Sequence, residues 1–138
     1  MIFIAFFSLI IAGAILRGIT DAILYSRKGA DAFPWNEHIV LTIDTIVICV
    51  GFAAGTLLEF NWVFLGFLAA AFWPSFSFFH NGVYNVTKNA IFKTGMSFFE
   101  AWTDTSKTST AKHKFDFKSR LYLLLFGLLI LTIGHIVL

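Results

Sequence analysis

The sequence predicts an all-α integral membrane protein with four transmembrane helices and one amphipathic helix on the membrane surface. Its 138 residues are 58% hydrophobic and only 13% charged, whereas soluble domains are about half apolar and a quarter charged. Phe, which adds apolar area without a polar atom, accounts for 18 residues. A soluble fold of this size would lack the polar residues to cover its surface, so the composition argues against a soluble globular protein.

Four apolar segments are long enough to cross a bilayer, which takes about 20 residues. The predicted spans are residues 2–25, 38–58, 62–79 and 121–138. In the first segment no basic residue precedes Arg17, whereas a secretory signal carries positive charge ahead of its apolar core. We therefore expect the first segment to be a retained membrane helix. The turn at 59–61 is so short that the second and third spans should form an antiparallel hairpin.

Small residues and proline mark two positions within the spans. Gly51 and Gly55 have the G-x-x-x-G spacing that lets two membrane helices approach closely, so we predict a helix-packing face there. Pro74 interrupts the third span, and proline usually kinks a helix because it removes a backbone hydrogen bond. The hydroxyls of Ser75 and Ser77 could satisfy the freed backbone groups.

The chain becomes polar between residues 81 and 120. Asparagines recur there every fourth residue, and four large side chains recur at intervals of seven and four, namely Tyr84, Ile91, Phe98 and Trp102. This spacing is typical of an amphipathic helix lying along a membrane. We therefore predict a basic connection over residues 81–120 that contains a surface helix.

The distribution of Lys and Arg predicts the orientation, because basic loops stay on the cytoplasmic side. Arg27 and Lys28 follow the first span, and seven more basic residues lie between residues 81 and 120. With four spans both groups face the cytoplasm, and both termini face outward. The residues predicted to contact anionic lipid, or nucleic acid inside a virion, are Lys88, Lys93, Lys112, Lys114, Lys118 and Arg120.

Ionisable residues inside membrane spans are costly and often mark function. In the four-span arrangement one layer near the cytoplasmic side brings together Arg17, Asp21, His38, Asp44, His80 and Asn81. Structural pairing is the main interpretation, and Arg17 and Asp21 can pair because they are four residues apart on a helix. The alternatives are a proton or ion pathway and, least favoured, a divalent metal held by two His and two Asp. No metal or other cofactor is predicted.

The layout resembles short multi-span membrane proteins of bacterial phages and prophages. The resemblance covers about the first two thirds of the chain. It is carried by the helix end at Asp21, PWNEH from Pro34 to His38, Asp44, and HNGVYN from His80 to Asn85. That group has no established activity, so it contributes no catalytic residue. It implies a bacterial inner membrane or the internal membrane of a phage.

No enzyme motif is present in the sequence. The leading hypothesis is therefore a non-enzymatic polytopic component that assembles with itself or with other membrane proteins, such as a subunit of a phage virion membrane or of a membrane complex. A holin-like pore-former is the first alternative. The second is a membrane-embedded enzyme or transporter that uses the Asp and His layer.

Overall fold

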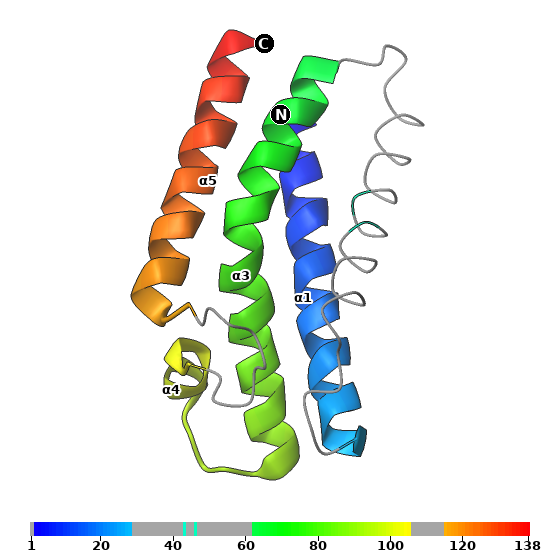
Figure 1. The fold of residues 1–138 in the computed structure, drawn as a ribbon, viewed down its shortest axis with the longest axis vertical. Coiled ribbons are helices and arrows are strands. Elements are labelled where there is room, and N and C mark those ends of the chain that lie inside the picture. The colour runs from blue at the N-terminus through cyan, green and yellow to red at the C-terminus, as the bar shows by residue number, and fades with distance from the viewer. Residues whose placement is uncertain (1, 29–42, 44–45, 47–61, 106–114) are drawn as a thin grey trace.

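The computed structural model describes residues 2–28, 43, 46, 62–105 and 115–138. Within these residues all regular secondary structure is helical (Figure 1), with elements α1 (Ile2–Lys28), α3 (Trp62–Phe92), α4 (Phe98–Thr103) and α5 (Phe117–Val137). The three long helices run along the longest axis of the molecule. In Figure 1 the short α4 is viewed nearly along its own axis, so it lies across the others.

Three helices in the described part of the chain are long and apolar enough to cross a membrane. These candidate spans are Ile4–Ser26, Trp62–Phe92 and Phe117–Val137. They coincide with three of the four predicted spans, so the all-helical membrane class agrees with the structure. The predicted span over residues 38–58, with Gly51 and Gly55, lies outside the described residues except for Ile43 and Ile46, which are helical.

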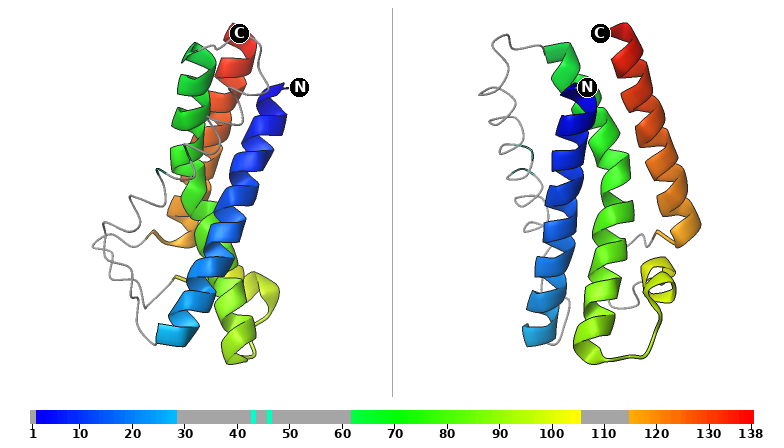
Figure 2. Two further views of the ribbon diagram at one scale, coloured as in Figure 1. Left: turned by 90° about the vertical axis from the view of Figure 1, so that its right-hand side faces the viewer. Right: turned by 180° about the vertical axis from the view of Figure 1, so that it is seen from behind.

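Of the two long helices beside α3, one runs in the same direction as α3 and the other in the opposite direction. Phe6 of α1 packs edge-on against Phe64 of α3 with 5.7 Å between ring centroids, and further along Tyr25 meets Tyr84. Helices α1 and α3 therefore run parallel. By contrast α5 runs antiparallel to α3, and both views in Figure 2 show its C-terminal end beside the start of α3.

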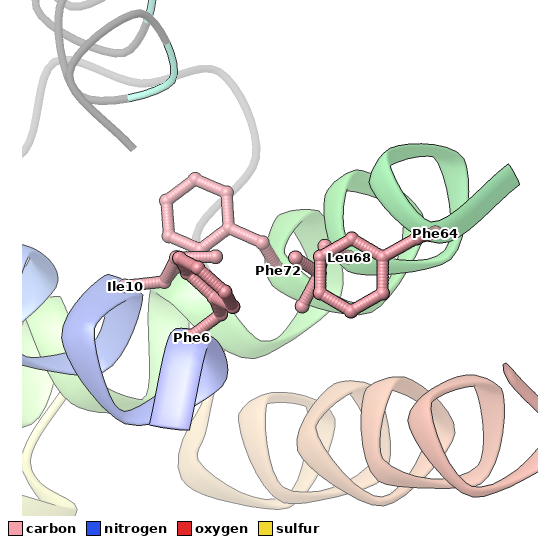
Figure 3. Close-up of a cluster of buried hydrophobic side chains, with 5 residues drawn as sticks. All are labelled: Phe6, Ile10, Phe64, Leu68 and Phe72. Carbon is pink, nitrogen blue, oxygen red and sulfur yellow. The ribbon is translucent and has the colours of Figure 1, made fainter. Parts of the chain in front are cut away.

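Apolar packing joins α1 and α3 near their N-terminal ends. Figure 3 shows two side chains from α1 and three from α3 in contact, and together they form the buried cluster Phe6, Ile10, Phe64, Leu68 and Phe72. The partly buried Ile46 packs against the same cluster. In a bilayer such contacts stabilise by close packing rather than by removal of water, because lipid tails are as apolar as the side chains.

Glycines set the closest approaches between the long helices. A Cβ atom built on Gly18 of α1 would lie 2.5 Å from the carbonyl oxygen of His80. On α5, a Cβ at Gly127 would lie 2.5 Å from the Ala71 carbonyl oxygen, and one at Gly134 would lie 2.7 Å from the Phe67 ring. A side chain would meet backbone atoms at Gly18 and Gly127 and the Phe67 ring at Gly134, so these glycines determine how α1 and α5 pack against α3.

Helix α3 continues through Pro74 without a break in its assignment. The hydroxyl of Ser75 donates a hydrogen bond of 2.8 Å to the Ala71 carbonyl, whereas the hydroxyl of Ser77 is buried without a partner. The carbonyl that loses its helical partner is that of Ala70, since Pro74 has no N–H. The expectation that the two serine hydroxyls relieve the proline is therefore wrong for both side chains.

The structure does not confirm the amphipathic surface helix predicted after residue 81, because the four large side chains that predicted it belong to two different helices. Helix α3 extends past Phe79 to Phe92, so it includes the asparagine stripe, Tyr84 and Ile91. The chain then reverses through Lys93 and Gly95, both with positive φ. Ser97 starts α4 with a capping box, in which its backbone N–H and hydroxyl lower the pKa of Glu100. Trp102 of α4 covers Gly82 instead of lying along a common face with Tyr84.

The packing predicts opposite effects of alanine at two glycines. Gly127→Ala should lower the free energy of unfolding by about 1–3 kcal/mol, because the new methyl group meets backbone atoms that cannot move aside. Gly66→Ala is the matched control, since nothing lies within 4 Å of its built Cβ, and it should gain up to about 1 kcal/mol of helix propensity. Unfolding by SDS titration in mixed micelles measures both. Equal effects would contradict the packing at Gly127.

Candidate functional site

A buried polar cluster joins α1 and α3 where their backbones come close at Gly18. Asp21 lies one turn after Arg17 on α1, and His80 faces Asp21 from α3. His80 Nε2 lies 2.8 Å from Asp21 Oδ2, and the Asp21 side chain also forms an ion pair with Arg17, whose Nε is 3.7 Å from Oδ1. The Arg17–Asp21 pair is the one that their spacing predicts.

Each ring nitrogen of His80 lies within hydrogen-bond distance of an oxygen atom. Its Nδ1 lies 2.9 Å from Asn81 Oδ1, while its Nε2 faces the Asp21 carboxylate. The imidazolium form can donate a proton in both bonds. If the Asn81 amide is turned around, the neutral ring makes the same two contacts, accepting at Nδ1. The site therefore accommodates both states of the ring.

The surroundings of this cluster are apolar and keep it from water. Asp21 is only 3% exposed, and the Phe76 ring stacks on the His80 ring with 4.8 Å between centroids. Two polar atoms nearby in the sequence are buried without a hydrogen-bond partner, Arg17 Nη2 and Ser77 Oγ. In such a setting the buried His80 and the partly exposed Arg17 offset the cost of burying the Asp21 carboxylate, because an unpaired buried charge is far more costly than a paired one.

Four of the six residues predicted to share one layer are placed by the structure, and all four meet here: Arg17, Asp21, His80 and Asn81. His38 and Asp44 lie outside the described residues. Within the described part of the chain no three His, Cys, Asp or Glu side chains gather closely enough to hold a metal ion.

A second polar site lies around Arg120, and sequence reasoning assigned it the wrong environment. Arg120 was expected to contact an anionic surface, but it is 1% exposed. Its Nη2 donates to the carbonyls of Trp102 and Asp104 at 3.2 and 3.0 Å. Asn85 Nδ2 donates to the same Asp104 carbonyl. Carbonyls at a helix C-terminus lack helical partners and attract cations, so Arg120 ties the end of α4 to α5.

The other predicted surface cations are in different environments. Lys88 Nζ lies 5.3 Å from the Tyr25 ring centroid and 5.9 Å from that of Tyr84, so it is held between α1 and α3. Lys93 and Lys118 are exposed. Lys112 and Lys114 lie outside the described residues.

Comparison of the chain with protein-family models, curated proteins and solved structures finds no match. The class of the protein therefore follows from its own structure: an α-helical chain whose described residues include three helices suited to crossing a membrane, with an Arg–Asp–His cluster between two of them.

The cluster predicts a strong effect at Asp21. Asp21→Leu should cost about 3 kcal/mol or more of unfolding free energy, because it leaves Arg17 and His80 without their buried carboxylate. Combined with His80→Phe, the loss should be smaller than the sum of the two single losses. Thr20→Leu, at an exposed neighbouring position, serves as the control. Additive losses at Asp21 and His80 in a denaturation series in detergent would contradict the coupling.

Proposed function

We propose that this chain is a four-span, non-enzymatic membrane component that assembles with itself or with other membrane proteins. The observation that carries the four-span part of the proposal is the parallel course of α1 and α3. The assembly part is supported by the apolar faces of the three described spans and by close helix packing at glycines, which is typical of membrane-protein assemblies.

Parallel neighbours in a membrane require the chain to return between them. Helix α1 ends at Lys28 at one end of the bundle, and α3 begins with Trp62 at the other. We therefore propose the fourth span between these two described ends, at residues 38–58, which are apolar and about as many as a span needs. The described ends thus favour four spans.

Charge supports the proposed orientation. Lys28, Lys88 and Lys93 lie at the end of the bundle where α1 and α3 finish, and Lys118 lies near the start of α5 on the same side. By the positive-inside rule this end faces the cytoplasm. Both chain termini then face outward, consistent with the neighbouring N and C labels in Figure 1.

The basic end also fits contact with an anionic lipid surface. Helix α4 lies across the bundle, and the exposed apolar side chains at this end include Met96, Phe98 and Phe99. Exposed Lys93 precedes them by three residues, and exposed Lys118 lies near the start of α5. Aromatic side chains beside lysine suit the headgroup region of an anionic bilayer. A phage or bacterial inner membrane is the proposed setting, on the sequence resemblance.

Topology reporters test the four-span proposal. A reporter at the C-terminus should be external and one inserted at Ser109 cytoplasmic, because α5 separates the two positions. A third reporter at the N-terminus should match the C-terminal one. If the N- and C-terminal reporters lie on opposite sides, the chain crosses an odd number of times and the four-span proposal fails.

The Asp21–His80 contact favours a second candidate function, proton-linked transport. An imidazole can accept a proton on one ring nitrogen and release one from the other, and His80 has a hydrogen-bond partner at each. A carboxylate and an imidazole in contact within a span are typical elements of proton pathways.

Proteoliposomes separate these functions. If the protein conducts protons, a dye-reported pH change under an imposed potential should be several-fold faster than in empty vesicles, and both Asp21→Asn and His80→Gln should abolish the increase. Ser8→Ala, at an exposed site on α1, should leave it unchanged. Leakage of a large trapped dye would indicate a holin-like pore instead. No flux of either kind would leave the cluster with a structural role only.

A further inference from the structure

One face of α3 is exposed at the level of the membrane and differs in composition from the exposed face of α5. Trp62 and Trp73 are 76% and 70% exposed, and they lie three helical turns apart on the same side. Between them Gly66, Ala69 and Ala70 are also exposed. We call these five residues the Trp–Ala face. Exposed positions on α5 carry mainly Leu, Ile and Phe, as expected for contact with lipid tails.

The depth of Trp73 is unfavourable for contact with lipid. If the apolar part of α3 starts at Trp62, Trp73 lies about 16 Å deeper, near the middle of a core about 30 Å thick. Tryptophan prefers the interface, where its N–H can meet water. No described residue forms a hydrogen bond with the Trp73 indole. An N–H donor without a partner at this depth is costly.

Ala70, one of the five residues of this face, has a backbone carbonyl without its usual helical donor. Pro74 cannot donate to the Ala70 carbonyl, and the Ser75 hydroxyl bonds to Ala71 instead. The Trp–Ala face therefore carries a donor at Trp73 and an under-used acceptor at Ala70 within one helical turn. On one straight helix the indole points outward, away from its own backbone. A second copy of the same face can supply each group with its partner.

Gly66 provides the space for such an approach. Four other helical glycines, Gly18, Gly82, Gly127 and Gly134, each lie against a neighbouring element, whereas nothing lies within 4 Å of a Cβ built at Gly66. Glycine costs about 1 kcal/mol relative to alanine inside a helix. Gly66 and Ala70 have the small-xxx-small spacing at which membrane helices cross.

We propose that the Trp–Ala face of α3 binds the same face of a second copy, making a parallel two-fold dimer in which Trp73 of each copy donates to the Ala70 carbonyl of the other. This rests on the proposed function as an assembling membrane component. The shared charge bias gives both copies one orientation, so the two-fold axis runs along the bilayer normal. In such an interface every contact occurs twice, so one donor and one acceptor per copy satisfy each other.

The test uses full-length protein reconstituted in vesicles of phosphatidylethanolamine and phosphatidylglycerol, labelled separately with donor and acceptor dyes. Energy transfer should rise with the protein-to-lipid ratio. Gly66→Leu should weaken association by about tenfold, and Trp73→Phe, which keeps the ring but removes the N–H, should weaken it several-fold. Ala12→Leu is the matched control, because Ala12 is a small exposed residue on α1, and it should associate like the parent. Helix content by circular dichroism checks that each variant folds.

Cross-linking tests the two-fold arrangement. In a Cys49→Ser background, Ala69→Cys should form a disulfide dimer on oxidation, because equivalent positions meet near the axis of a parallel pair, while Ala12→Cys should not. If the parent associates but Gly66→Leu and Trp73→Phe both match it and Ala69→Cys forms no disulfide dimer, the Trp–Ala face is not the interface, although assembly stands. Capture of a different membrane protein through this face would overturn self-association. A parent that neither associates nor retains another membrane protein would refute the proposed assembly itself.

Discussion

The close approach of α1 and α3 at Gly18 is the constraint on which the cluster between them depends. A side chain at that position would meet the backbone of α3, and the helices would then separate. The 2.8 Å contact between Asp21 and His80 needs the small spacing that Gly18 permits. Because polar groups at this depth have few alternative partners, a wider spacing would leave His80 without its carboxylate and Asp21 with only the Arg17 pair on its own helix.

Helix α3 is the centre of the described structure, and its neighbours use different chemistry along its length. Near its start it meets α1 through aromatic and aliphatic side chains. At the same level it meets α5 through Gly127 and Gly134, and near the basic end it supports α4 through Gly82 and Asn85. Polar contacts are concentrated toward the basic end. The apolar side chains therefore favour insertion of the helices into a membrane. The polar contacts fix the register and rotation of each helix relative to α3, which apolar packing alone specifies weakly.

The sequence predicted the features that depend on composition and local spacing. Apolar length located three helices, and the i to i+4 spacing gave the Arg17–Asp21 pair. The contact of His80 with Asp21 followed only as a shared depth, because depth depends on topology but contact depends on helix rotation. The extent of α3 was missed because asparagine spacing is equally compatible with a continued span and with a separate surface helix. The burial of Arg120 depends on where α4 ends in space, and nothing near residue 120 reports that.

The glycines at the described contact between α3 and α5 could not be predicted from the sequence either. Gly51 and Gly55 stood out by their mutual spacing, whereas Gly127 and Gly134 are seven apart and lie within a uniformly apolar helix. Their role depends on facing Ala71 and Phe67 of another helix. A pairwise contact between distant segments leaves no pattern in a single chain unless both sides carry a recognisable motif.

The unequal lengths of the helices limit the thickness of bilayer that suits this protein. Helix α5 has 21 residues and spans about 31 Å, from its N-cap at Asp116 to its C-cap at Leu138. A thinner bilayer would expose its apolar ends to water. Helix α3 has 31 residues, but a thicker bilayer would draw Asn85 and Asn89 into hydrocarbon. The two helices thus set a lower and an upper limit, and membranes whose thickness falls between them would retain this protein preferentially.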